Sequence, residues 1–237
     1  MLPNLNEINA LNTHILTLPS GKTIKIRKWK MRDKKEYLLK VDKNSPKEDL
    51  NKIIENIVAS CIMDDTKFQD LNTPDFIYLF IELRKLSEGD TFEFAFECGS
   101  CKELNENVNL DLSSALHIYS KTTKDLTLSN GLTFSFKDIP YVKEKLLEVT
   151  YKENTVDLNI AIIAASIKSV YFKNTPYNNF TEEELKVLIE DLDVNNFKEL
   201  FDYLVKNMSS TDLYFSTACK KCGKVNNIAL EGLENFF

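Results

Sequence analysis

The sequence predicts an α+β protein that has a helical body and short antiparallel strands. Apolar residues recur at helical spacing in several segments, while other short segments alternate between apolar and polar residues. Two of the alternating segments run directly into Cys-x-x-Cys motifs, one before the middle of the chain and one near its end. The 237 residues contain no low-complexity linker, so we expect a single compact α+β unit over residues 1–237.

The first part of the chain predicts an N-terminal hairpin followed by helices. Within residues 14–28, two segments flank Pro19-Ser20-Gly21, and the second of them alternates between apolar and polar residues, as a hairpin strand does. In the helical part, residues 32–86, Ser45 is expected to cap the second helix, with Pro46 at its first helical position. The third helix is apolar almost all round, so we expect it to be central. The three helices are expected over residues 32–41, 46–62 and 73–86.

The rest of the chain predicts two hairpins with Cys-x-x-Cys knuckles and an insertion between them. The first knuckle, the turn with Cys98 and Cys101, belongs to residues 90–112. The second, the turn with Cys219 and Cys222, belongs to residues 211–237. Residues 126–207 form a hairpin plus a helical insertion, with a two-residue turn at Asn130-Gly131 and a capping box made by Thr181 and Glu184. The helices of the insertion are expected over residues 142–151, 156–172 and, as a pair, 182–206.

The two knuckles repeat one pattern, an aromatic strand that runs into Cys-x-x-Cys and then into a polar segment with asparagines (Asn105 and Asn107; Asn226 and Asn227). A structural Zn²⁺ takes four ligands in a tetrahedron, and one Cys-x-x-Cys turn aims two sulfurs at a common point. We therefore expect a zinc-ribbon-like module. Its structural, four-thiolate Zn²⁺ would be held by Cys98, Cys101, Cys219 and Cys222. More than a hundred residues separate the knuckles, against about 15–20 in familiar sites, so the matching strand context carries the prediction.

Other interpretations of these cysteines stay open at this stage. A redox Cys-x-x-Cys opens a helix whose N-terminus lowers the thiol pKa, whereas both knuckles lead into strand-like segments. Disulfides fit poorly with a cytosolic chain, and free thiols without a shared role are a further alternative. Cys61 lies on the apolar stripe of its helix, which indicates a small core residue. Four lysines beside the knuckles either offset the negative charge of the site or are solvated: Lys102, Lys220, Lys221 and Lys224.

The sequence contains no signature of an enzyme, so we expect no catalytic residue and no small-molecule substrate. It has no phosphate-binding glycine loop, no nucleophile elbow and no zinc-protease motif. His14 falls in an expected strand and His117 in an expected loop, both away from any nucleophile pattern. The carboxylates of Glu182-Glu183-Glu184 suit a solvated helix start.

Composition and charge restrict the partners and the location. The net charge of −6 disfavours nucleic acid, because binding to phosphates needs a positive field. A zinc-ribbon adaptor that binds nucleic acid is the alternative function, with Lys220, Lys221 and Lys224 as its candidate contacts. No apolar run approaches the about 20 residues of a membrane helix, and residues 1–7 lack the pattern of a secretory signal. We expect the cytosol, or a particle assembled there.

Four features form a pattern over nearly the whole chain. They are the strand 24–27 before a Lys/Glu-rich helix, the run 78–90 with Leu83-Arg84-x-x-Ser87-x-Gly89-Asp90, the first knuckle, and the second knuckle with terminal Phe236-Phe237. This pattern resembles the baseplate-hub subunit family of T4-like contractile-tailed bacteriophages. The sequence departs from that family at Gly99, where proline often stands. Terminal aromatic residues are expected to be buried.

The resemblance implies a non-enzymatic structural or assembly component of a phage tail baseplate, a virion protein assembled in the host cytoplasm. Its partners would be other baseplate, hub and tail proteins, and a homo-oligomer within the assembly is compatible with it. Together with the cysteines, the resemblance favours a zinc-stabilised protein–protein interaction module.

Overall fold

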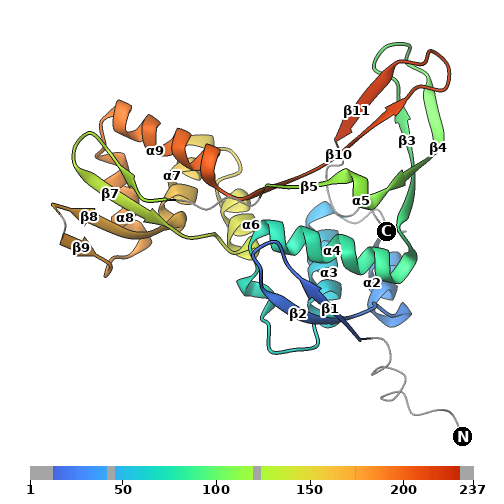
Figure 1. Ribbon diagram of the computed structural model, residues 1–237, viewed down its shortest axis with the longest axis horizontal. Coiled ribbons are helices and arrows are strands. Elements are labelled where there is room, and N and C mark those ends of the chain that lie inside the picture. The colour runs from blue at the N-terminus through green and yellow to red at the C-terminus, as the bar shows by residue number, and fades with distance from the viewer. Residues whose placement is uncertain (1–12, 42–45, 120–123, 174, 230–237) are drawn as a thin grey trace, which may run out of the picture. The chain divides into compact units, whose positions relative to one another are not determined.

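The computed structural model describes residues 13–41, 46–119, 124–173 and 175–229 (Figure 1). Over these residues the chain forms helices and short antiparallel sheets, which confirms the predicted α+β class. Contacts divide the chain into two compact units: unit 1 comprises residues 1–68, 75–118 and 211–237, and unit 2 comprises 69–74 and 119–210. The expected single compact unit is not tested by this division and stays a prediction. Ser45, Phe236 and Phe237 lie outside the described residues.

Unit 1 begins with a hairpin of β1 (Thr13–Thr17) and β2 (Thr23–Arg27). Its loop closes through Gly21, whose N–H donates to the Leu18 carbonyl at 2.8 Å and whose φ of 86° suits glycine. The strand β2 turns Ile24 and Ile26 into the core. The helices α2 (Met31–Val41), α3 (Lys47–Cys61) and α4 (Thr73–Glu88) follow, with a 3-10 turn, η1 (Phe68–Asp70), before α4.

The start of α3 differs from the prediction by one residue. Pro46 is the N-cap of α3 and not its first helical residue, because its ψ of 146° is extended. The pyrrolidine ring fixes only φ, which is compatible with either position.

The helix α4 is the centre of unit 1, as its apolar composition predicts. Side chains on several sides of this helix are fully buried: Phe76, Leu79, Phe80, Ile81 and Leu83. Its C-terminal end is held by Arg84, whose Nη1 donates to the Gly89 carbonyl at 2.6 Å. Gly89 has a φ of 103°, a conformation that favours glycine. Ser87 Oγ accepts from the Trp29 N–H at 3.1 Å. The run from Leu83 to Asp90 therefore forms the junction between a helix and the following strand.

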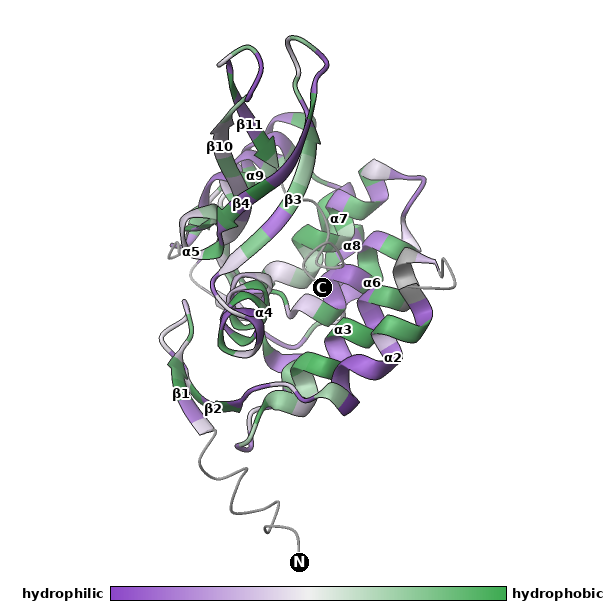
Figure 2. Cartoon of the chain, turned by 90° about the vertical axis from the view of Figure 1, so that its right-hand side faces the viewer, coloured by the Kyte–Doolittle hydropathy of each residue, from purple (hydrophilic) through white to green (hydrophobic). Residues whose placement is uncertain are grey.

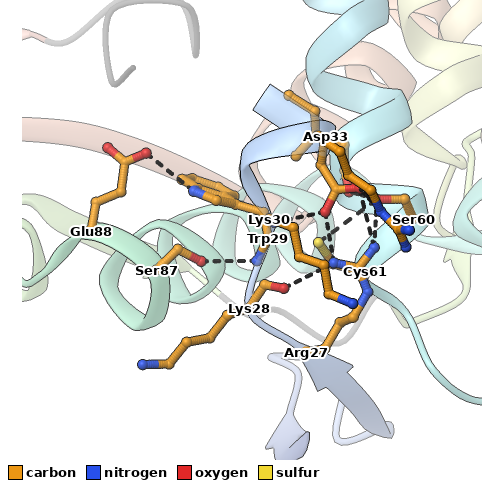
Figure 3. A network of polar contacts seen from close by, with 11 residues as sticks. Arg27, Lys28, Trp29, Lys30, Asp33, Ser60, Cys61, Ser87 and Glu88 are labelled. Carbon is orange, nitrogen blue, oxygen red and sulfur yellow. Dashed lines mark hydrogen bonds and ion pairs between the residues drawn. The ribbon is translucent and has the colours of Figure 1, made fainter. Parts of the chain in front are cut away.

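A buried ion pair links the hairpin to the helices (Figure 3). Arg27 Nη1 lies 2.7 Å from Asp33 Oδ2 in α2, and Arg27 Nη2 donates to Ser60 Oγ in α3 at 3.3 Å. Burial alone would raise the pKa of Asp33, but the hydrogen bonds from Arg27 and from the Lys30 N–H, together with the charges of Arg27 and Arg32, outweigh burial and lower it. Cys61 lies beside the pair as a fully buried core residue, which confirms its expected role, and burial raises its pKa to about 11.

The remaining strands of unit 1 carry the knuckles. β3 (Thr91–Glu97) pairs with β4 (Leu104–Asp111), and a short helix α5 (Leu112–Ala115) follows. A second sheet has the order β11-β10-β5, formed by β5 (Leu116–Tyr119), β10 (Ser210–Ala218) and β11 (Val225–Ala229). The strand β5 was not expected; His117, predicted in a loop, lies in it and stacks on Tyr214 of β10 at 3.9 Å between ring centroids.

Unit 2 packs helices against an antiparallel sheet of order β6-β7-β8-β9. The sheet contains β6 (Leu126–Thr127), β7 (Leu132–Phe136), β8 (Ile167–Phe172) and β9 (Thr175–Tyr177). The helices are α6 (Tyr141–Thr150), α7 (Thr155–Ser166), α8 (Glu182–Glu190) and α9 (Val194–Asn207). One core joins the sheet to α7, α8 and α9, with Phe134 of β7, Ile163 of α7, Leu185 of α8 and Leu200 of α9 all buried. The capping box of Thr181 and Glu184 is confirmed at the start of α8.

Two predictions for unit 2 are wrong in detail. The helix expected over 156–172 ends at Ser166, and the rest is strand β8, because these residues pair with β7 from Leu132↔Phe172 onward. The hairpin turn has three residues and not two. The Leu128 N–H donates to the Leu132 carbonyl, and Gly131, with a φ of 85°, completes the turn as a bulge residue.

The ion pair leads to a stability prediction. Arg27→Ala leaves the Asp33 carboxylate buried without its partner, so we expect the free energy of unfolding to fall by about 3 kcal/mol. The matched control is Arg32→Ala, since the Arg32 side chain is 74% exposed although it lies 3.7 Å from Asp33; its effect should stay within about 0.5 kcal/mol. Denaturant unfolding measures both, and equal effects would contradict a structural role for the pair.

Candidate metal centre

The two knuckles are the turns of two antiparallel hairpins in unit 1. β3 and β4 pair from Thr91↔Asp111 to Glu97↔Leu104. β10 and β11 pair from Tyr214↔Ala229 to Ala218↔Val225. The two ribbons lie side by side and bring their turns together in both views of the chain (Figure 1 and Figure 2).

The backbones of the two turns match. In the first, the Cys98 N–H donates to the Glu103 carbonyl at 2.9 Å, and the Lys102 N–H donates to the Cys98 carbonyl at 3.0 Å. In the second, the Cys219 N–H donates to the Lys224 carbonyl at 2.9 Å, and the Gly223 N–H donates to the Cys219 carbonyl at 2.9 Å. Lys102 and Gly223 occupy the same place in the two turns, and both are left-handed, with φ values of 60° and 71°.

The four cysteine sulfurs converge, as the sequence analysis predicts. Cys98 Sγ lies 3.8 Å from Cys222 Sγ, and Cys101 Sγ lies 3.7 Å from Cys219 Sγ. All four sulfurs lie within 4.8 Å of one another. A tetrahedron with Zn–S bonds of about 2.3 Å has edges of about 3.8 Å. Within the described residues this is the one cluster of potential metal ligands, and its size fits a four-thiolate metal ion.

Backbone amides already favour thiolates in this cluster. The N–H groups of Cys101 and Ser100 lower the pKa of Cys98 to about 6, because they stabilise its charged form. The N–H of Cys222 lowers the pKa of Cys219 in the same way. The pKa of Cys101 is raised to about 12, since burial and the other three sulfurs outweigh the favourable N–H of Glu103. Backbone hydrogen bonds therefore favour the thiolate at Cys98 and at Cys219, the first cysteine of each knuckle.

The lysines beside the knuckles make contacts within the hairpins. Lys221 Nζ lies 2.6 Å from a carboxylate oxygen of Glu103 in the opposite knuckle, and this hydrogen bond raises the pKa of Lys221. Lys220 Nζ donates to the Glu106 carbonyl at 2.6 Å. Lys102 Nζ lies 3.2 Å from Glu97. Lys224 contributes its backbone carbonyl to the second turn. Glu103 and Glu106 thus engage two lysines that a nucleic-acid adaptor would turn toward phosphates.

The geometry disfavours the other interpretations of the cysteines. All five are free thiols, and the sulfur separations far exceed the about 2.05 Å of a disulfide bond. Each knuckle leads into a strand, β4 or β11, and not into the helix N-terminus that a redox motif uses. Neither His14 in β1 nor His117 in β5 belongs to the sulfur cluster.

Two asparagines lie next to the cluster, and the sequence indicates them only as part of the repeat. Asn105 Oδ1 accepts from the Lys220 N–H at 2.8 Å, and Asn226 Oδ1 accepts from the Gly99 N–H at 3.0 Å. Each asparagine is the fourth residue after the second cysteine of its knuckle. This equivalent placement was the signal available in the sequence.

Comparison with known proteins adds the family context. A model of the family described as T4 bacteriophage base plate protein matches residues 11–237 of the chain, which include both knuckles and the helical regions. No curated protein and no solved structure matches the chain.

The thiol pKa values lead to a test on the metal-free, reduced protein. Cys98 has a folded pKa of about 6, lowered from 9.0. It should therefore be a thiolate at pH 7 and become protonated as the pH falls through about 6. Thiolate absorbance near 240 nm, titrated from pH 5 to 8, should show this step in the wild type and a smaller step in Cys98→Ser, which lacks one thiolate. A wild type that shows no step below pH 8 would contradict the assignment.

Proposed function

Since the chain belongs to the T4 bacteriophage base plate protein family, we propose that it is a non-enzymatic structural subunit of the baseplate hub, held in its binding-competent form by a zinc clamp. It is a structural component of a phage tail baseplate. The observation that carries the finer proposal is the convergence of four cysteine sulfurs from two hairpins that are distant in sequence.

In this proposal Cys98, Cys101, Cys219 and Cys222 hold one Zn²⁺. Four thiolates fill the tetrahedral shell and leave no position for water, so the site is structural and not catalytic. The amide hydrogen bonds that lower the pKa values of Cys98 and Cys219 support such a site, because metal ligands must be deprotonated. Zn²⁺ has no redox chemistry of its own, and its bonds to sulfur would join the hairpins.

The clamp would matter because of where it lies along the chain. Unit 1 contains residues 75–118 and 211–237, and the main segment of unit 2, residues 119–210, runs between them. A cross-link that closes a loop of about 100 residues stabilises a fold by on the order of 4–5 kcal/mol in the disulfide analogy. This approaches the whole stability of a typical domain, about 5–15 kcal/mol. Without the metal, the β10–β11 hairpin should loosen before the helices unfold.

We further propose that the partners are neighbouring baseplate, hub and tail proteins, and a homo-oligomer within that assembly is compatible with this proposal. The protein would be assembled in the host cytoplasm and carried in the virion, without a small-molecule substrate and without insertion into a membrane. None of the helices in the described part of the chain is long and apolar enough to cross a membrane. Binding to nucleic acid is disfavoured by the net charge of −6 and by the contacts of Lys220 and Lys221.

The zinc clamp is tested by metal content and by assembly. Purified wild type should contain one zinc per chain. Cys222→Ser should lose the metal and reduce the yield of baseplates, counted by electron microscopy, at least tenfold, because one missing thiolate opens the shell. Cys61→Ala is the matched control: it removes the one cysteine outside the cluster and should retain zinc and assembly.

A wild type without zinc would contradict the clamp, and so would a Cys222→Ser protein that assembles like the wild type. A DNA-binding assay at increasing salt addresses the alternative function. An adaptor should bind with an affinity that falls steeply with salt, whereas the proposed baseplate subunit should not bind.

A further inference from the structure

The two knuckle hairpins correspond to each other residue by residue. Phe94, Cys98, Cys101 and Asn105 in the first have Phe215, Cys219, Cys222 and Asn226 at a constant offset in the second. Equivalent residues also meet: the rings of Phe94 and Phe215 pack edge to face with centroids 4.5 Å apart. The contacts that each knuckle makes with the other are therefore nearly the same, as in a twofold-symmetric pair formed within one chain.

The asparagines cross between the hairpins. The Asn226 side chain of the second hairpin accepts from the N–H of Gly99, directly after the first cysteine of the first knuckle, at 3.0 Å. The Asn105 side chain of the first hairpin accepts from the N–H of Lys220, directly after the first cysteine of the second knuckle, at 2.8 Å. Both bonds fix the backbone beside a sulfur, and neither involves a metal.

The two asparagines differ in how deeply they are placed. Asn105 is 2% exposed. Its Nδ2 donates to the Glu103 carbonyl at 3.0 Å and lies 3.5 Å from Cys219 Sγ in the opposite knuckle. Asn226 is half-buried, and its Nδ2 donates to the Lys224 carbonyl of its own turn at 2.9 Å. The Asn226 side chain also hydrogen-bonds to Cys98, so each asparagine contacts a sulfur of the opposite knuckle, and Asn105 is the more deeply buried of the two.

We propose that Asn105 and Asn226 are crossed positioning residues, each of which holds the opposite knuckle in place, and that Asn105 also strengthens metal binding through its amide contact with Cys219. Because the crossed bonds need no metal, they hold the knuckles together before metal arrives. The part of this proposal that concerns metal affinity rests on the proposed zinc clamp, whereas the crossed contacts do not.

Burial determines how much metal affinity is lost when Asn105 or Asn226 is removed. Removing Asn105 leaves the partly buried Lys220 N–H without its acceptor, and water replaces an acceptor less readily there than at the exposed Gly99 N–H. Loss of a partner that orients a metal ligand typically lowers metal affinity by about 10–100-fold. Asn226 is partly exposed, so water can substitute for its oxygen, and its removal should lower the affinity by less than about 10-fold.

Amide hydrogen exchange on the full-length, metal-free, reduced protein tests the crossing. In the wild type, NMR should find both the Gly99 and the Lys220 amides protected. Asn226→Ala should speed exchange at Gly99 at least tenfold and leave Lys220 unchanged, while Asn105→Ala should do the reverse. Asn109→Ala, an exposed position on β4, is the control and should change neither amide.

The exchange result would overturn the proposal if each variant affected the amide of its own hairpin, or if both amides were unprotected in the wild type. If Asn105→Ala fails to fold, the half-buried Asn226→Ala still decides the crossing, because only the remote Gly99 should respond. These outcomes do not depend on whether the chain binds zinc.

Titration with Co²⁺, followed by its sulfur-to-metal charge-transfer absorption, tests the second part. Asn105→Ala should lower the affinity by about 10–100-fold. Asn105→Asp keeps the acceptor for Lys220 but loses the amide donor to Cys219, so it should weaken metal binding without exposing the Lys220 amide. Wild-type affinity in both variants would overturn the role of Asn105 at the metal. A wild type that binds no Co²⁺ or Zn²⁺ would instead contradict the zinc clamp, while a crossed exchange pattern would still stand.

Discussion

The convergence of four cysteine sulfurs from β3–β4 and β10–β11 is the constraint on which this part of the protein depends. A two-stranded hairpin is marginally stable by itself, and β3–β4 is a two-stranded sheet. The edge-to-face contact of Phe94 with Phe215 and the hydrogen bonds of the crossed asparagines join the two hairpins. The sulfurs then form a cluster whose dimensions suit one tetrahedral metal ion.

The rest of unit 1 is stabilised by a conventional apolar core. The helix α4 buries Phe76, Phe80 and Leu83 completely, and the Arg27–Asp33 pair joins β2 to α2 beside it. Arg84 and Gly89 serve the junction from α4 to β3. This segment therefore anchors the first knuckle hairpin to the helical core.

Local signals in the sequence were sufficient wherever local chemistry determines the structure. The Thr181 capping box, the apolar helix α4 and both knuckles could be predicted from residue type and spacing. The boundary between α7 and β8 could not, because no glycine or proline marks Ser166 and the strand forms by pairing with β7. The roles of Asn105 and Asn226 were also hidden, since each contact reaches a residue more than a hundred positions away.

X-ray absorption at the zinc edge of the purified, full-length protein is the most direct test of the central claim that one metal ion joins the two knuckles. We predict a shell of four sulfur atoms at about 2.3 Å and no nitrogen or oxygen ligand. Such a shell requires both hairpins, because each supplies two of the four cysteines. A shell that contains nitrogen or oxygen, or a protein purified without zinc, would contradict the account.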